Sequence, residues 1–295
     1  MMLNGKLIID ELLIILFVFT LSLFPVEART TSGNGQKVLV ISSYSPIKEE
    51  GNHLIASFID QMQVDSEAKI FVEYMDCEAS PVFETWVGWM RQLFAAYKVK
   101  PDVVVLLGNE AWSSYRHEIP VVLGYVKGAF IDYENKDKKL FSVADMMPMK
   151  ESFGDFRITG YSYKDFVIEN LSLIKQLQPH IRKVAFCYDN RYNMAFFESY
   201  INDLFEQIDS LDLRYMDGCK LSTPQLLDSI ACMDDSYAIL SAGWYTDALQ
   251  YPHAHSMLHN ELARYTSKPV YQVLDQGTSN MNYIGGYFIS GEDLG

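Results

Sequence analysis

Polar and aromatic side chains follow the apolar segments of this chain that have the pattern of buried strands. Hydroxyl, amide, carboxylate and aromatic groups in such places suit a polar small molecule with one flat or apolar surface. Turn-forming residues also gather after strands, and for any single position that is the competing explanation. The predicted ligand-binding residues are Ser43, Tyr44, Asn109, Glu110, Tyr188, Asn190, Trp244 and Asp275.

Motifs that would indicate catalysis are missing from the sequence. It contains no glycine-rich phosphate loop, no G-x-S-x-G turn and no usual zinc-ligand spacing. The nearest metal candidate is the group His253, His255 and His259, but no carboxylate is spaced as an HExxH site requires. We interpret these as surface histidines near a helix start, and we predict no catalytic residue, metal or cofactor.

The segments that would position these side chains alternate between strand and helix patterns. Lys37–Tyr44 is a continuous β-branched run, typical of a strand buried on both faces of a parallel sheet. Val82–Tyr97 repeats apolar residues at helical spacing. Such alternation predicts parallel sheets built from βαβ units, whose ligand groups lie at the carboxyl ends of the strands. Further predicted strands are Lys69–Asp76, Pro101–Gly108, Val121–Val126, Lys183–Tyr188, Leu211–Met216, Tyr237–Ala242 and Pro269–Leu274.

This alternation occurs in two series, which meet at Ile158-Thr159-Gly160. We predict one lobe over residues 37–160 and a second over 161–285, with 286–295 returning to the first. The crossovers Thr159-Gly160 and Ile284-Gly285-Gly286 are expected to lie together, with glycine supplying a permissive backbone. Two α/β lobes joined in this way would hold a small ligand in the cleft between them.

The first 28 residues have the pattern of an export signal. Leu12–Phe24 is an apolar run, and Val26-Glu27-Ala28 fits cleavage after Ala28. An uncleaved membrane anchor is the alternative, although the run is short for a span of about 20 residues. A net charge of −14 argues against nucleic acid and an anionic membrane surface as partners.

The four cysteines show no CxxC spacing. Four free thiols are the favoured interpretation, and a disulfide between Cys219 and Cys232 is the alternative, which export would permit. At the other end of the chain, Ser290 and Asp293 form a helix-start signature with no helix after it. We therefore expect the C-terminus to lie inside a longer protein.

The order and spacing of several motifs resemble one known family. These motifs are Val38–Ser45, Pro120-Val121-Val122, Ile158-Thr159-Gly160 with the following helix and Pro179, Lys268–Tyr271, and Ile284–Tyr287. Over about Lys37–Gly295 the chain resembles the periplasmic-binding-protein-like domains of the ABC-transporter substrate-binding family. The same domain occurs as the extracytoplasmic sensor of two-component histidine kinases, including hybrid ones.

The resemblance implies a type I fold, with two Rossmann-like lobes that close on a ligand. In such domains, positions corresponding to Ser43, Tyr44, Asn109, Glu110, Asn190 and Asp275 hold the ligand. The expected function is solute sensing in a transmembrane histidine kinase, with the domain in the periplasm and tethered to the inner membrane. A free periplasmic receptor of an ABC transporter is the alternative, and an enzyme on the same scaffold is the third class. Expected partners are a small solute and either downstream membrane and kinase segments or an ABC permease, with a homodimer left open.

Overall fold

The computed structural model describes most of the chain after its first 34 residues. The described residues are 35–46, 49–65, 67–80, 82–131, 146–163, 166–189, 191, 194, 201–202, 211–250, 253, 257–273 and 283–288. The predicted export signal, Asn190, His255 and Asp275 lie outside them. Gln36–Gly295 forms one compact unit that contains both lobes.

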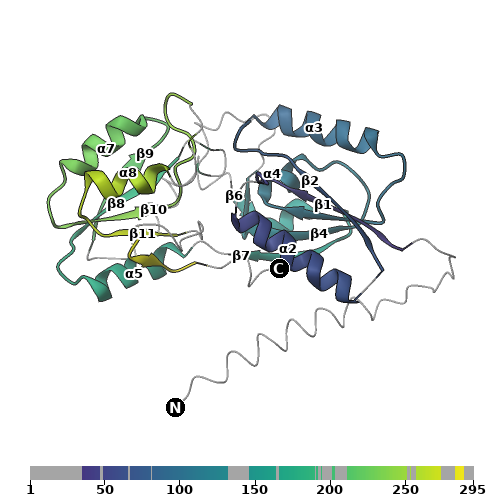
Figure 1. Ribbon diagram of the computed structural model, residues 1–295, viewed down its shortest axis with the longest axis horizontal. Coiled ribbons are helices and arrows are strands. Elements are labelled where there is room, and N and C mark those ends of the chain that lie inside the picture. The colour runs from purple at the N-terminus through teal and green to yellow at the C-terminus, as the bar shows by residue number, and fades with distance from the viewer. Residues whose placement is uncertain are drawn as a thin grey trace, which may run out of the picture. The chain divides into compact units, whose positions relative to one another are not determined.

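The first lobe is built on a five-stranded parallel sheet of order β2-β1-β3-β4-β7 (Figure 1). Side chains of its central strand alternate between two faces, as the pleat requires. Val38 and Val40 pack with Leu54 of the helix α2, whereas Leu39 and Ile41 enter the cluster that contains Trp86 of α3. The strands are β1 (Lys37–Ser42), β2 (Lys69–Tyr74), β3 (Val103–Leu107), β4 (Val121–Lys127) and β7 (Ile158–Tyr163).

The helices of this lobe connect strands that follow one another along the chain. They are α2 (Glu49–Asp65), α3 (Phe83–Ala96) and the short α4 (Asn109–Ser114). Between β4 and β7 the chain forms a small antiparallel pair and one 3-10 turn, namely β5 (Ala129–Ile131), β6 (Met146–Pro148) and η3 (Met149–Phe153).

The second lobe repeats the design with a five-stranded parallel sheet of order β12-β11-β10-β8-β9. Val184 and Phe186 face the side of α5, while Ala185 and Cys187 face the cluster formed with α7 and α8. Its strands are β8 (Lys183–Tyr188), β9 (Asp212–Asp217), β10 (Tyr237–Ser241), β11 (Val270–Gln272) and β12 (Gly285–Gly286), and its described helices are α5 (Val167–Leu177), α7 (Thr223–Ala231) and α8 (Met257–Tyr265).

The predicted fold class, two lobes that each have a parallel sheet flanked by helices, is confirmed. The strand β7 continues to Tyr163, beyond the predicted boundary at 160, and Gly285 and Gly286 form the edge strand of the second sheet. The two predicted crossovers are therefore strand segments, and they belong to different sheets.

Contact between the two crossovers is made by residues that follow Thr159-Gly160 and Gly285-Gly286 along the chain. Asn170, which is completely buried, donates through Nδ2 to the carbonyl oxygens of Phe166 and Tyr287, each at 2.8 Å. The Tyr287 N–H donates to Asn170 Oδ1, also at 2.8 Å. The rings of Phe166 and Tyr287 lie 5.4 Å apart, so one amide joins the start of α5 to the segment after β12.

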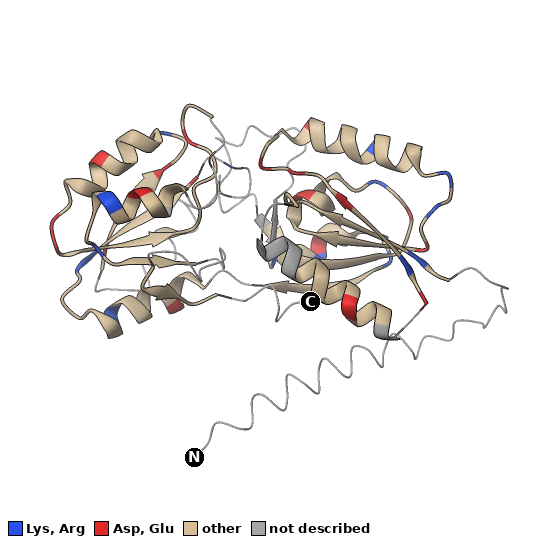
Figure 2. Cartoon of the chain, viewed as in Figure 1, with Lys and Arg blue, Asp and Glu red and all other residues tan. Residues whose placement is uncertain are grey.

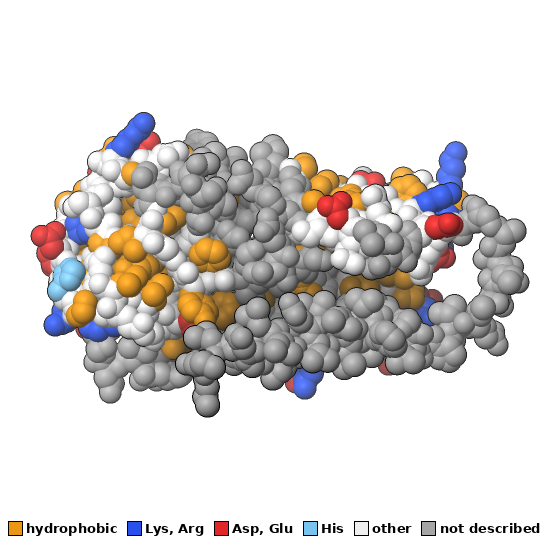
Figure 3. All heavy atoms as spheres, turned by 60° about the horizontal axis from the view of Figure 1, so that its bottom comes forward, with side chains coloured by type: hydrophobic (Ala, Val, Ile, Leu, Met, Phe, Trp, Pro, Cys, Tyr) orange, Lys and Arg blue, Asp and Glu red, His pale blue; other side chains and the backbone are white. Residues whose placement is uncertain are grey.

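Lys and Arg, and Asp and Glu, occur on both lobes (Figure 2). Exposed hydrophobic residues include Leu177 and Ile284, and hydrophobic side chains are interspersed with polar ones over the second lobe on one face (Figure 3). Cys77 and Cys187 are buried, and no disulfide joins the four cysteines. No helix among the described residues is long and apolar enough to cross a membrane.

Two glycines offer a matched test of the first lobe. Gly160 has φ +143°, and a Cβ there would lie 2.1 Å from the carbonyl oxygen of Leu123, whereas a Cβ on Gly88 in α3 would meet no atom within 4 Å. We expect Gly160→Ala to lower the free energy of unfolding by at least about 2 kcal/mol, through backbone strain and that contact. Gly88→Ala should raise it by about 0.4–1 kcal/mol. Urea denaturation measures both, and equal stability of the two variants would contradict the assigned β4–β7 pairing.

Candidate functional site

The turn from β3 into α4 places two predicted residues at the carboxyl end of the first sheet. Gly108 has φ +96°, and a Cβ there would lie 2.6 Å from Ser43 Oγ. The same hydroxyl accepts the N–H of Ala111 at 2.9 Å. Ser43 therefore stabilises the start of α4, and the first turn of that helix carries Asn109 and Glu110.

Both residues of this first turn are buried. Asn109 Oδ1 accepts the Lys127 N–H at 2.8 Å and so joins α4 to the end of β4. Glu110 is only 6% exposed, and its Oε2 has no hydrogen-bond partner in the described part of the chain. A buried carboxyl oxygen in this condition costs free energy that a bound donor would recover.

Arg191, which follows β8, occupies the corresponding place in the second lobe. Its Nε donates to Asp189 Oδ2 at 2.6 Å, and its backbone N–H donates to Asp189 Oδ1 at 3.1 Å. The Tyr245 N–H donates to Asp189 Oδ2 at 3.0 Å, and the guanidinium carbon lies 4.2 Å from the centre of the Tyr245 ring. Asp189 thus fixes both the guanidinium and the ring that covers it.

The guanidinium also reaches the first lobe. Arg191 Nη1 forms an ion pair with Glu78 Oε1, in the loop after β2, and the two side chains are 7% and 12% exposed. Arg191 Nη2 is buried and, among described residues, has no hydrogen-bond partner. One cation therefore bonds to both lobes and keeps a further donor available.

Burial and charge shift the ionisation of this group. Burial raises the pKa of Glu110 and Glu78 raises it further, whereas the cations Arg191 and Lys127 oppose both effects. Burial alone would lower the pKa of Arg191, but the carboxylates of Asp189 and Glu78 outweigh it and raise that pKa. Arg191 therefore stays charged, and three carboxyl groups share two cations.

A row of tyrosines adjoins Glu110 at the carboxyl ends of β1, β4 and β7. The rings of Tyr44 and Tyr125 lie 5.4 Å apart at 80°, and those of Tyr125 and Tyr163 lie 5.2 Å apart at 29°. Burial, followed by the charge of Glu110, raises the pKa of Tyr44. The row adds partly exposed flat apolar surface to the buried charges.

Two other predicted residues lie in hydrophobic packing. Tyr188 is 3% exposed, and its ring contacts Phe186 and Tyr215. Trp244 is also 3% exposed, packs in the cluster of α7 and α8, and donates from Nε1 to Thr223 Oγ1 at 2.9 Å. The aromatic residue beside the site is therefore Tyr245, the neighbour of the predicted Trp244.

Polar atoms without partners among the described residues also occur in the loop after β10 and at the end of β11. Thr246 Oγ1 and both amide atoms of Gln272 are buried and, within the described residues, make no hydrogen bond. Native proteins leave few such atoms, and each one requires an explanation. Like Glu110 and Arg191, these atoms lie at or after the carboxyl ends of strands, so both sheets have unsatisfied polar atoms on this side.

His253 takes part in contacts that hold two segments of the second lobe together. Its Nε2 lies 2.9 Å from Thr223 Oγ1 and 3.2 Å from Asp247 Oδ2, and Asp247 Oδ2 also accepts the Thr223 N–H at 2.8 Å. These contacts attach the loop after β10 to the first turn of α7. No group of His, Cys, Asp and Glu within the described ranges could hold a metal ion.

Comparisons with known proteins identify the fold. No protein-family model and no curated protein matches the chain. A Streptococcus pneumonia ABC domain in complex with L-Trp has 15% identity and a TM-score of 0.60, covering 87% of this chain and 80% of its own. A conserved domain protein of Vibrio cholerae has 13% identity and a TM-score of 0.60, with the same coverage. A periplasmic sugar-binding protein from Legionella pneumophila has 13% identity and a TM-score of 0.53, covering 88% and 90%. The fold is that of type I periplasmic binding proteins.

The raised pKa of Glu110 has a consequence for stability. Because the folded state retains this proton above the ordinary value of 4.5, where the unfolded chain has lost it, deprotonation disfavours folding as the pH rises. We expect Glu110→Gln to gain free energy of unfolding relative to the unchanged protein as the pH rises from about 4.5 toward neutrality. Denaturation of both proteins at several pH values measures this difference. A difference that is constant with pH would show that Glu110 ionises normally.

Proposed function

We propose that this chain is an extracytoplasmic domain that binds a small solute between the carboxyl ends of its two sheets. The observation that carries this proposal is a pair of buried atoms on side chains from different lobes, Glu110 Oε2 and Arg191 Nη2, neither of which has a hydrogen-bond partner among the described residues. Ligands of open α/β sheets bind outside the carboxyl ends of the strands, which is where both residues lie.

The chemistry of these atoms defines what the solute must offer. Arg191 requires a hydrogen-bond acceptor, and a carboxylate or a hydroxyl oxygen would satisfy it. Glu110 requires a donor while it is ionised, such as an ammonium or hydroxyl group. The row formed by Tyr44, Tyr125 and Tyr163 would cover a flat or apolar part of the solute.

Solute binding would be coupled to the arrangement of the lobes. The Glu78–Arg191 ion pair joins them, and a solute that bonds to Arg191 Nη2 and Glu110 adds contacts on both sides of the same junction. A ligand shifts a conformational equilibrium only by its difference in affinity for the two states. Contacts to both lobes at once provide that difference in favour of the closed arrangement.

For the intact protein, we propose a ligand-sensing role in a transmembrane histidine kinase. The support is the apolar segment Leu12–Phe24 with its cleavage motif and the family resemblance, and closure would be transmitted to downstream membrane segments. A receptor feeding an ABC permease is the second candidate, since two fold neighbours are an ABC domain and an ABC sugar transporter's periplasmic binding protein. Both roles are non-catalytic.

A thermal-shift screen of amino acids, sugars and nucleosides would identify the solute. We expect Arg191→Ala and Glu110→Ala each to weaken binding of that solute by roughly 5- to 150-fold, because each removes one buried polar partner worth about 1–3 kcal/mol. Calorimetric titration measures the affinity. The control is Arg264→Ala on α8, whose side chain is 74% exposed. Unchanged affinity in both site variants would place the solute elsewhere.

The two roles of the intact protein differ in what a deletion strain loses. If the protein is a sensor, the strain takes up the identified solute at the normal rate but loses the transcriptional response to it. If it is a transport receptor, uptake of labelled solute falls instead. Uptake and transcript measurements in one strain therefore decide between the candidates.

A further inference from the structure

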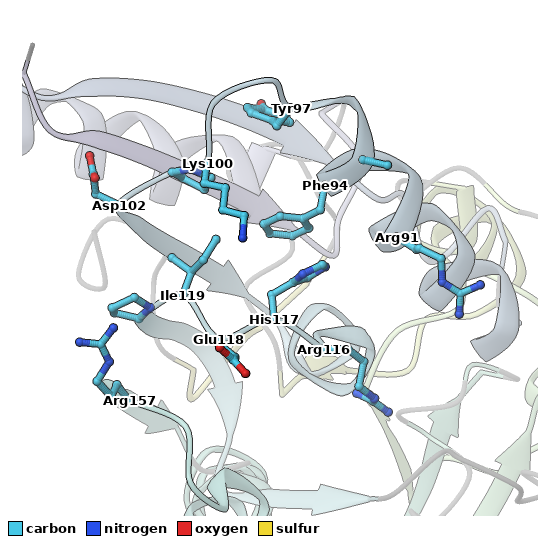
Figure 4. Close-up of a pocket in the computed structure, with 13 residues that line it drawn as sticks. Arg91, Phe94, Tyr97, Lys100, Asp102, Arg116, His117, Glu118, Ile119 and Arg157 are labelled. Carbon is cyan, nitrogen blue, oxygen red and sulfur yellow. The ribbon is translucent and has the colours of Figure 1, made fainter.

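A groove with a volume of about 890 Å³ lies at the amino ends of strands in the first sheet (Figure 4). Its walls come from the end of α3, the residues ahead of β3, the segment between α4 and β4, and the residue ahead of β7. Because the strands are parallel, this edge is opposite to the one that carries Glu110 and Tyr44. The groove is therefore separate from the proposed solute site.

The rim of this groove is mainly basic. Arg91, Lys100, Arg116 and Arg157 line it, and none of Arg91, Lys100 and Arg157 forms an ion pair with a described residue. Figure 4 shows Arg157 at one end, Arg91 and Arg116 at the other, and Lys100 between them. The groove is therefore a local concentration of positive charge on a chain whose net charge is −14.

Two carboxylates also line the groove but do not neutralise it. Asp102 Oδ2 accepts the Lys37 N–H at 2.8 Å and so serves the start of β1. Glu118 is exposed and lies between the basic ends in Figure 4. The four basic side chains therefore outnumber the two acidic ones, and Asp102 already accepts the Lys37 N–H.

The floor of the groove is apolar and aromatic. The Phe94 ring lies over the His117 ring, with centres 3.8 Å apart, and Ile119 extends the floor toward β4. Burial, and then the charge of Lys100, lowers the pKa of His117, which keeps its imidazole neutral at physiological pH. The result is a cationic rim over an uncharged floor.

We propose that this groove binds an extended acidic segment of a partner protein. Cations distributed along a groove, rather than converging on one point, match carboxylates distributed along an extended chain. The floor of Phe94 and Ile119 accepts apolar side chains between those carboxylates. Glu118 interrupts the row of cations along the groove, which suits an acidic segment with apolar residues between its charges better than nucleic acid, whose charge is dense and continuous. This site does not depend on the proposed solute binding.

A fluorescein-labelled peptide of about twelve residues, alternating Glu with Leu or Phe, tests this proposal by fluorescence anisotropy with the 295-residue chain. We expect saturable binding that weakens as salt rises, because exposed charges are screened. The double variant Arg91→Glu/Arg157→Glu should weaken binding at least about tenfold. Both side chains are exposed, so the thermal midpoint should not change.

The matched control is Arg214→Glu/Arg264→Glu, which makes the same change in net charge at exposed positions of the second lobe. The proposal requires that this control bind the peptide like the unchanged protein. Lys100→Glu serves as the test variant if the first double variant loses its fold. Absence of saturable binding, or an equal loss in both double variants, would overturn the proposal. Tighter binding of a single-stranded oligonucleotide of equal charge, lost in the same variants, would assign the groove to nucleic acid instead.

Discussion

The candidate site depends on the burial of one guanidinium. Removing the Arg191 side chain from water costs several kcal/mol unless carboxylates surround it, so Asp189 and Glu78 are both needed. Asp189 belongs to the loop after β8 and also binds the N–H of Tyr245 in the loop after β10, while Glu78 follows β2 in the first lobe. Three loops from two sheets are therefore positioned by a single charge, and any change in that charge alters all three.

Hydrogen bonding in the cluster of Arg191, Asp189, Glu78 and Glu110 is incomplete among the described residues. Within the described part of the chain, one oxygen of Glu110 and one guanidinium nitrogen of Arg191 have no hydrogen-bond partner, although both side chains are almost completely buried. A folded protein tolerates such groups where a ligand later satisfies them, because the cost in the free state adds to the affinity of the bound state. The same argument applies to Gln272 at the end of β11, whose buried amide has no partner among the described residues.

Much of the fold could be predicted from the sequence because strand and helix patterns are local. The run Val38–Ile41 alternates between two apolar faces, and β3 leads directly into Asn109 and Glu110. The bond between Arg191 and Glu78 could not be predicted, since it joins residues 113 positions apart through packing alone. The choice between Trp244 and Tyr245 also depends on the backbone after β10, which turns the indole toward α7 and the phenol ring toward Arg191.

The two ends of the first sheet differ in how their charges respond to solution conditions. At the carboxyl end the charges are buried, so salt screens them little, whereas Arg91 and Arg157 at the amino end are exposed and respond to salt. The strands β3, β4 and β7 join the two ends, since residues ahead of them line the groove and residues at their carboxyl ends, Glu110, Tyr125 and Tyr163, form the site. Every residue of the groove belongs to the first lobe. A partner bound there would therefore stay attached whether or not the second lobe moves, and solute-driven closure could act against a fixed first lobe.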